Sequence, residues 1–327
     1  MKKNLKKSLS VIIMTLIMSA LLIGCGRKDK DEIIVNEAEL LEEQTPLPSV
    51  EGAEIIYMDE EDEIAIPVPE QNNYDAADIP IVNQNALQIV FLGDDNLDNN
   101  RNSTGVASLV GEKIDATIYN IAIAGSNVAF IEDDGISTDN INMLNARSLV
   151  GITGILAGHN DADGLGEIRA AELIDEINIE KTDYFVIMYN ANDFFHRIPL
   201  DTEDFDEGVY TYVGAFRRAV IYLREAAPYA DIIICTPHYS LFFDENNIYL
   251  GDGNILHNGI GTLNDYRGKA EHTAKYYKTI YVDSYYGMGI DGYSAEYLLD
   301  RGYYLSEEGR EVFADYLVRI IKANEEP

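Results

Sequence analysis

The chain contains no tryptophan and only two cysteines, Cys25 and Cys235, in 327 residues. Two cysteines form at most one disulfide bond, so a fold held together by several disulfides is excluded. Cys235 ends the apolar run Asp231–Cys235, and a thiol in such a run usually packs as a small hydrophobic group. Because neither cysteine has the spacing of a zinc or redox motif, we expect no metal and no cofactor.

Basic residues are also scarce. The chain has 24 Lys and Arg against 57 Asp and Glu, which gives a formal net charge of −33 at pH 7. Proteins that bind nucleic acid neutralise its phosphates with clustered Lys and Arg, so we exclude nucleic acid as a partner. The excess of acidic residues indicates a strongly solvated, self-repelling surface.

The first 24 residues have the pattern of a secretory leader. Lysines stand at positions 2, 3, 6 and 7, an apolar stretch runs from Leu9 to Ile23, and Gly24 precedes Cys25. The stretch is short for a membrane-spanning helix of about 20 residues, and a small residue before cysteine suits lipoprotein cleavage. We therefore predict a signal peptide over 1–24 and a lipid such as palmitate on Cys25. The protein would then be a lipoprotein of the cell envelope, anchored at the extracytoplasmic face of a bacterial membrane.

Composition divides the rest of the chain into two parts. Residues 25–85 are rich in Asp, Glu, Pro, Gln and Asn and include the acidic run Asp59–Glu63, so we expect a largely disordered tether. Within the tether, the apolar patch Ile64–Val68 is a candidate for local docking. Residues 86–327 have the length of one α/β domain.

This domain alternates apolar runs with helical patterns. The runs have the length of buried strands, and they are Leu87–Leu92, Ala116–Ile123, Tyr184–Tyr189, Asp231–Cys235 and Thr279–Val282. Helical periodicity covers Glu207–Ala227, Asn264–Tyr277 and the segment after Ser306. The alternation predicts an α/β three-layer sandwich with a central parallel sheet of about five strands. Such sheets bind ligands at the carboxyl ends of their strands, so the residues directly after each run are the candidate site.

Four blocks occupy such positions in a fixed order. They are Gly93-Asp94-Asp95, Tyr119–Ser126, Asn190-Ala191-Asn192-Asp193 and, before the last helix, Leu299–Gly309. Together they resemble the blocks of the SGNH (GDSL-type) hydrolases, a family of esterases and acylhydrolases with a flavodoxin-like fold. The resemblance covers the predicted domain to the end of the chain.

The resemblance implies a role for single positions. The family's nucleophilic serine falls on Asp95, and its two oxyanion donors, a backbone amide and an asparagine side chain, fall on Gly125 and Asn192. Its Asp-x-x-His pair falls on Arg301 and Tyr304. The nucleophile, the base and the acid of the family are thus all replaced, whereas the donors are kept.

These replacements change the expected chemistry. A carboxylate at Asp95 is a poor nucleophile toward an ester, and its charge would compete for the amide of Gly125 and the side chain of Asn192. A phenol at Tyr304, with an ordinary pKa of about 10, is protonated at neutral pH and cannot act as a general base. The leading prediction is an SGNH-like pseudoenzyme that binds an envelope carbohydrate or a protein partner.

An active enzyme is the alternative prediction. A rearranged catalytic set drawn from Ser126, His196 and His238 would give an esterase or a polysaccharide deacetylase. It requires one histidine within about 3 Å of a hydroxyl that faces the oxyanion donors. Ser126 also fits the N-cap of a helix, and loop histidines are more often hydrogen-bonded or solvated. A structural envelope protein without a ligand site is the third possibility.

A calcium loop is matched only in part, by four oxygen-bearing residues at alternate positions: Asp94, Asn96, Asp98 and Asn100. The glycine expected at the sixth position and the glutamate expected at the twelfth are missing. Asp95 and Asp193 would be the remaining carboxylates for a hard cation. We therefore predict no dedicated metal site.

Tyrosines gather in the last third of the chain, with nine between Tyr276 and Tyr304. Amphipathic rings near a groove suit stacking on sugar faces. The same rings also suit packing at a wet domain surface, because a chain without tryptophan needs tyrosine for large aromatic contacts.

Overall fold

The computed structural model describes residues 55–58, 64, 86–132, 141–202 and 208–326. The chain divides into two units, Met1–Pro46 and Leu47–Pro327, and all described residues belong to the second. The predicted signal peptide, Cys25 and most of the predicted tether lie outside the described residues and stay predictions. In the part of the chain that is described, no helix is long and apolar enough to cross a membrane.

Five parallel strands form the central sheet in the order β3-β2-β4-β5-β9. Their bounds are Thr117–Asn120 for β3, Gln88–Gly93 for β2, Tyr184–Met188 for β4, Asp231–Cys235 for β5 and Ile280–Val282 for β9. Every residue of β4 is buried, because this strand lies in the middle of the sheet with helices on both faces. The predicted parallel sheet of five strands is confirmed.

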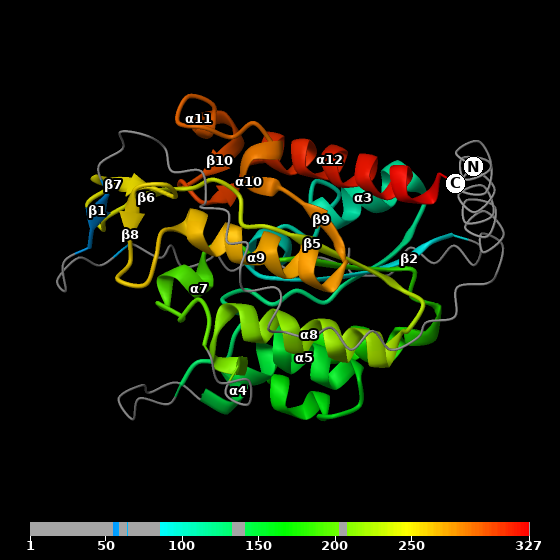
Figure 1. Ribbon diagram of the computed structural model, residues 1–327. Coiled ribbons are helices and arrows are strands. Elements are labelled where there is room, and N and C mark those ends of the chain that lie inside the picture. The colour runs from blue at the N-terminus through cyan, green and yellow to red at the C-terminus, as the bar shows by residue number, and fades with distance from the viewer. Residues whose placement is uncertain (1–54, 59–63, 65–85, 133–140, 203–207, 327) are drawn as a thin grey trace, which may run out of the picture. The chain divides into compact units, whose positions relative to one another are not determined.

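Helices cover both faces of this sheet (Figure 1). On one face lie α3 (Val106–Ile114) and α12 (Glu307–Glu325), and on the other lie α5 (Leu149–Leu156) and α8 (Tyr212–Ala226), with α9 (Leu263–Tyr277) packed against α8. The start of α12 follows from its sequence, since the Ser306 side chain accepts a hydrogen bond from the Gly309 amide and caps the helix. The predicted three-layer sandwich is thus confirmed.

Shorter elements complete the fold. The short helices are α2 (Asp95–Asp98), α4 (Ile141–Arg147), α6 (Ile168–Glu176), α7 (Asn192–Phe195), α10 (Ser284–Gly287) and α11 (Ala295–Leu298), with 3-10 turns at Ala162–Leu165, Ile179–Lys181 and Gly208–Tyr210. Three two-stranded pairs are β6 (Leu241–Phe243) with β7 (Tyr249–Asp252), β10 (Leu299–Asp300) with β11 (Tyr304–Leu305), and β1 (Ile56–Tyr57) with β8 (Leu256–His257). Both α2 and α7 lie directly after a strand of the sheet, and therefore they carry the candidate site.

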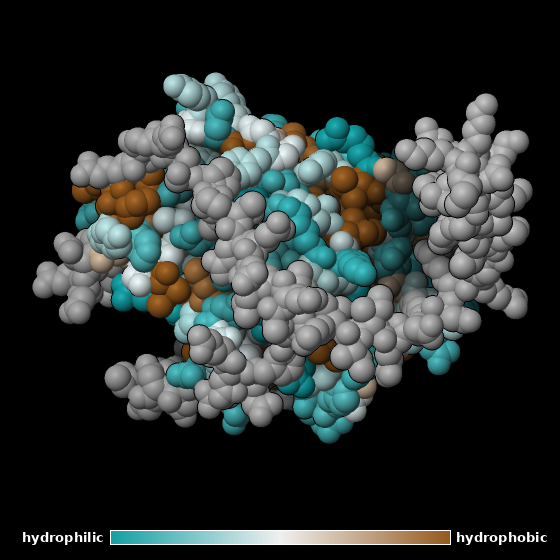
Figure 2. Space-filling model, in the orientation of Figure 1, coloured by the Kyte–Doolittle hydropathy of each residue, from teal (hydrophilic) through white to brown (hydrophobic). Residues whose placement is uncertain are grey.

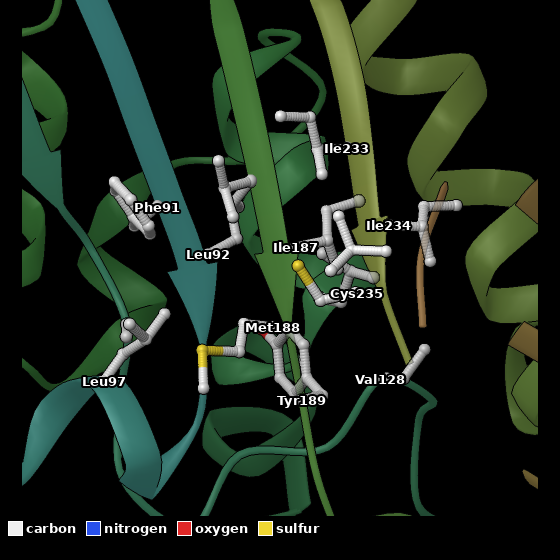
Figure 3. Close-up of a cluster of buried hydrophobic side chains, with 14 of the residues drawn as sticks. Phe91, Leu92, Leu97, Val128, Ile187, Met188, Tyr189, Ile233, Ile234 and Cys235 are labelled. Carbon is white, nitrogen blue, oxygen red and sulfur yellow. The ribbon is translucent and has the colours of Figure 1, made fainter. Parts of the chain in front are cut away.

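The core lies directly beneath the carboxyl ends of the strands. Figure 3 shows Leu92 of β2, Ile187 and Met188 of β4 and Cys235 of β5 in one buried cluster. Leu92 pairs with Ile187, and Met188 pairs with Cys235, so the three strands end at a common level. The residues that follow them are thereby brought together above a rigid apolar floor.

The start of α8 differs from the prediction of a helix over Glu207–Ala227. Residues 208–210 form a 3-10 turn, and α8 begins only after Thr211, whose side chain accepts a hydrogen bond from the Gly214 amide. The Thr211 N-cap thus marks the point where the 3-10 turn ends and the α-helix begins.

One short part of the predicted tether is ordered in the described structure. In β1, the amide of Ile56 donates to the carbonyl of Ile255, and the Tyr57 ring lies 4.8 Å from the His257 ring. Ile64, in the patch predicted to dock, is half-buried against the core. Figure 2 shows apolar surface in the region of β1, β6 and β7, where Ile56 and Ile248 are exposed. The tether therefore contributes a strand to the domain at this edge.

Candidate functional site at the strand ends

The site begins where β2 ends at Gly93. A Cβ atom at Gly93 would lie 2.3 Å from the Met188 carbonyl oxygen of the neighbouring strand, so only glycine fits this position. The chain then turns into α2, and the Asp94 side chain accepts a hydrogen bond from the Asn96 amide at 3.1 Å. This cap directs the next residue, Asp95, toward the ends of the neighbouring strands.

The Asp95 carboxylate accepts hydrogen bonds from both groups that the sequence analysis predicts as oxyanion donors. Its Oδ2 atom accepts a hydrogen bond from the Gly125 amide at 2.8 Å and another from Asn192 Nδ2 at 2.9 Å. Asn192 also donates to the Ser126 carbonyl at 3.0 Å, which fixes the orientation of its amide group. Only 6% of Asp95 and 8% of Asn192 is exposed to solvent. The structure thus brings Asp95, Gly125 and Asn192 together in one buried cluster.

The loop that carries Gly125 is held by a second carboxylate, Asp98. Its Oδ2 atom accepts a hydrogen bond from the Ala124 amide at 2.7 Å. Its Oδ1 atom lies 2.6 Å from Arg101 Nε and 3.2 Å from a terminal guanidinium nitrogen of Arg169. A positive φ of 73° at Gly125 completes the turn, which favours glycine.

The two arginines also bind the end of β3. Both donate hydrogen bonds to the carbonyl groups of Asn120 and Ala122. Our sequence analysis missed this cluster. The spacing of three residues between Asp98 and Arg101 is a weak signal for a pair, whereas Arg169 lies 71 residues from Asp98 and no local pattern marks it.

Asp94 is a deeply buried acid of the site. Its Oδ2 atom accepts a hydrogen bond from the Asn190 amide at 2.7 Å. Burial, and then the nearby charge of Asp95, raise the pKa of the Asp94 carboxyl to about 8, although its two amide donors act in the opposite direction. At neutral pH the pair Asp94 and Asp95 therefore does not carry two full charges.

The Asn190 side chain links three segments at the strand ends. Its Oδ1 atom accepts from the His238 amide at 3.0 Å, after β5. Its Nδ2 atom donates to the Tyr303 carbonyl at 3.0 Å and to Ser240 Oγ at 3.3 Å. Asn190 therefore acts as a structural crosslink.

Tyr304 lies beside this cluster in β11. The next residue, Leu305, donates its amide to Asn96 Oδ1 at 2.9 Å, which ties β11 to α2. Burial, and then the charge of Asp95, raise the pKa of Tyr304 to about 12. Arg301, the other position of the family's Asp-x-x-His pair, is exposed in the turn before β11, with a φ of 50°. A phenol in this setting stays protonated at neutral pH.

The residues proposed for a rearranged catalytic set do not form one in the described structure. The Ser126 hydroxyl donates to the carbonyl groups of Ile123 at 2.7 Å and Gly93 at 3.2 Å. No helix begins at Ser126, so its interpretation as an N-cap is wrong, and the two carbonyl groups explain its position instead. His196 Nδ1 lies 3.0 Å from Asn127 Oδ1.

His238 is buried, and its Nδ1 atom lies 2.9 Å from the Tyr239 carbonyl oxygen. Because a carbonyl only accepts, Nδ1 carries the proton, and Nε2 has no hydrogen-bond partner among the described residues. Burial lowers the pKa of His238 to about 4. In the described part of the chain, neither His196 nor His238 makes a hydrogen bond to a hydroxyl group.

Asp193 accepts hydrogen bonds from a different pair of donors than Asp95 does. Its two oxygens accept hydrogen bonds from the amides of Val128 at 2.8 Å and Ala129 at 3.0 Å. Burial raises the pKa of Asp193 to about 7. Across residues 55–58, 64, 86–132, 141–202 and 208–326, no group of three or more His, Cys, Asp or Glu is arranged to hold a metal ion.

The remaining aromatic and histidine candidates lie in different surroundings. His159 pairs with Glu225 at 2.8 Å and lies against the Tyr222 ring on α8. Of the tyrosines, Tyr285, Tyr303 and Tyr304 are buried, whereas Tyr286, Tyr293 and Tyr297 are exposed. The charge of Asp95 contributes to the raised pKa values of Tyr303 and Tyr304.

Neither the family models nor the curated proteins include a match to this sequence. Solved structures do resemble it. A possible lipase from Chitinophaga pinensis is 17% identical with a TM-score of 0.50, over 73% of this chain and 98% of its own. A protein from Lactobacillus plantarum is 15% identical with a TM-score of 0.50, over 73% of this chain and 97% of its own. A lipase/acylhydrolase from Enterococcus faecalis is 20% identical with a TM-score of 0.42, over 73% of this chain and 96% of its own.

These likenesses extend to the fold alone, because the identities are low. The chain has the α/β fold of the SGNH (GDSL-type) hydrolases.

Proposed function

We propose that this protein is a membrane-anchored lipoprotein whose SGNH-type domain does not hydrolyse esters and acts by binding an envelope ligand or partner. The observation that carries the proposal is the pair of hydrogen bonds from Gly125 and Asn192 to Asp95 Oδ2. In an acyl-transfer site, donors of this kind stabilise the oxygen of the tetrahedral intermediate as it gains negative charge. Here the protein's own carboxylate takes the place of that oxygen.

Charge repulsion opposes a second anion at this position. Two unit charges about 4 Å apart repel by about 4 kcal/mol at an effective dielectric constant of about 20. An oxyanion formed beside the Asp95 carboxylate would meet this repulsion and would find the donors already engaged. The arrangement therefore disfavours the transition state that an esterase must stabilise.

A base is missing as well. Tyr304 occupies the position of the catalytic histidine in the family pattern, and its raised pKa leaves it a proton donor at neutral pH. A rearranged set with Ser126 is not supported by its contacts, because the hydroxyl faces two carbonyl groups. The leader pattern before Cys25 supports export and lipidation, and with them a ligand or partner in the envelope.

Hydrolysis of p-nitrophenyl acetate tests the proposal. The full chain should release p-nitrophenol no faster than buffer, and Asp95→Ser alone should also be silent, because it lacks a base. The variant Asp95→Ser with Arg301→Asp and Tyr304→His restores the family's residues, and we expect turnover from it above both of its parents. Turnover by the unmodified chain that is lost in Ser126→Ala would refute the proposal and establish the alternative esterase.

A further inference from the structure

A groove of about 500 Å³ lies between α3 and α12 on one face of the sheet (Figure 1). Its floor is apolar, because it is formed by the half-buried side chains of Leu109 and Val312, which pack against the core. Exposed carboxylates line its α12 side, and they belong to Glu307, Glu308, Glu311 and Asp315. The volume lies within the range of ordinary ligand sites, roughly 300–1,000 Å³.

The chain itself places one ammonium group against these carboxylates. Lys113 of α3 has its Nζ atom 2.5 Å from a Glu311 oxygen and 3.0 Å from an Asp315 oxygen. Hydrogen bonds to Glu311 and then to Asp315 raise the pKa of Lys113, so the contact favours the charged amine. A lysine side chain that reaches across from a neighbouring helix therefore shows the kind of group that this surface of α12 binds.

The other end of the groove, at the start of α12, has no such cation. In the described part of the chain, neither Glu307 nor Glu308 forms an ion pair. The basic residue closest to them in the sequence is Arg310, and its guanidinium group donates to the carbonyl groups of Thr104 and Leu305. The lining thus carries more negative charge than Lys113 balances, and it attracts a ligand of positive charge.

The carboxylates are spread along the groove. Counted from Glu308, Glu311 and Asp315 stand three and seven residues further on, so they share one face of α12 and span about 10 Å. A compact cation spans only part of this distance and leaves the apolar floor uncovered. Lysine and arginine fit better, because they bury their methylene stems on apolar surface while their charged ends stay in water. Three residues of an extended peptide cover the same distance of about 10 Å.

We propose that the groove between α3 and α12 binds a basic, extended segment of a partner protein, in which lysine or arginine residues flank apolar ones. Its cations pair with Glu307 and Glu308, and its apolar side chains cover Leu109 and Val312. The charge of the groove and its apolar floor thus select the same partner. This surface is independent of the ester chemistry proposed above, because none of its lining residues belongs to the Asp95 cluster.

Titration calorimetry on the full chain tests the proposal with three acetylated and amidated peptides. The probe is Lys-Leu-Val-Lys-Lys-Leu-Val-Lys. One counterpart has glutamine in place of every lysine, and the other has serine in place of every leucine and valine. We expect the probe to bind at least about tenfold more tightly than either counterpart. Added salt should weaken this binding, because part of it is ionic.

Variants of the chain locate the binding surface. Glu307→Gln combined with Glu308→Gln removes two carboxylates from the groove and should weaken binding of the probe by at least about tenfold. The matched control is Glu172→Gln combined with Asp175→Asn, which removes two exposed carboxylates from α6 and should leave the affinity unchanged.

An undetectable affinity for the probe, equal affinity for the probe and either counterpart, or an equal effect of the two double variants would each overturn the proposal. Spermidine distinguishes a peptide from a small polycation. If spermidine binds as tightly as the probe, the groove recognises charge alone and a basic protein segment is the wrong partner. The two proposals fail separately, since ester hydrolysis by the unmodified chain refutes the proposed function and has no bearing on the groove.

Discussion

The carboxylate of Asp95 accepts a hydrogen bond from the backbone amide of Gly125, at 2.8 Å and across 30 residues of sequence. This contact joins the start of α2 to the loop after β3, two segments that follow neighbouring strands of the sheet. A hydrogen bond to a charged acceptor is roughly twice as strong as one between neutral groups. The same contact that fills the site therefore also stabilises the geometry of its donors.

The first prediction concerns the ionic cluster that supports the Gly125 loop. Asp98→Asn should lower the free energy of unfolding by about 3–5 kcal/mol, because it leaves the charges of Arg101 and Arg169 buried without their partner. Urea denaturation measures the change. Lys113→Ala is the matched control, since Lys113 pairs with Glu311 and Asp315 at a more exposed position, and its loss should cost less than about 1 kcal/mol. Equal losses of unfolding free energy in the two variants would contradict the role of Asp98 as the buried partner of Arg101 and Arg169.

The second prediction is a decline of stability with rising pH. The pKa values of Asp94 and Asp193 are raised in the folded chain to about 8 and about 7, from 3.8. Their favourable contribution is therefore complete below pH 3.8 and is lost as the pH rises through 7 and 8. The free energy of unfolding should fall between about pH 4 and pH 8, by at most about 1.4 kcal/mol per pH unit for each group, and the fall should end once the pH passes the two raised pKa values.

Urea midpoints across this range measure the slope. Asp193→Asn loses one of two amide contacts and should be less stable at every pH, but its slope should be shallower than that of the unmodified chain. Asp163→Asn, at an exposed acid, should leave the slope unchanged. A stability that stays constant or increases over this range would show that the two acids are ionised in the folded chain at neutral pH.

The third prediction concerns the opposite end of the pH scale. His238 is buried, and its pKa is lowered to about 4 from 6.5, so its neutral form is required in the folded chain. The stability it contributes is present above pH 6.5 and is lost as the pH falls toward 4. His238→Asn should be less stable than the unmodified chain near pH 7. The difference in unfolding free energy should narrow by about 1.4 kcal/mol for each pH unit below about 6.5. A difference that is the same at pH 5 and pH 7 would be incompatible with a buried neutral imidazole.

The sequence predicted the sheet and the placement of Asp95, Gly125 and Asn192 because both depend on local patterns. Strands buried on both faces read as apolar runs, and parallel strands place the residues after them along one edge. Arg169 and Asn190 could not be predicted in the same way. Their roles depend on side chains that reach other segments, 71 residues away for Arg169 and 113 for Asn190.

The strand β1 shows a different limit of sequence analysis. Ile56 and Tyr57 stand in a stretch whose composition is that of a disordered tether, and a pair of residues is too short for a periodic signal. The pairing with β8 depends on an edge that the folded domain presents, and that edge is visible only in three dimensions. The N-cap interpretation of Ser126 failed for a similar reason, because one of its two carbonyl partners, Gly93, lies 33 residues away and becomes a neighbour only after folding.

The Asp95 carboxylate holds the two oxyanion-type donors. The most direct test is the NMR chemical shift of the Gly125 amide proton and of the Asn192 side-chain amide, compared between the unmodified chain, Asp95→Ala and the control Asp163→Ala. A charge-assisted hydrogen bond places both signals downfield in the unmodified chain, and we predict that both move upfield in Asp95→Ala and stay in place in the control. Signals that do not change in Asp95→Ala would show that the donors are free, and the account of a self-filled site would be wrong.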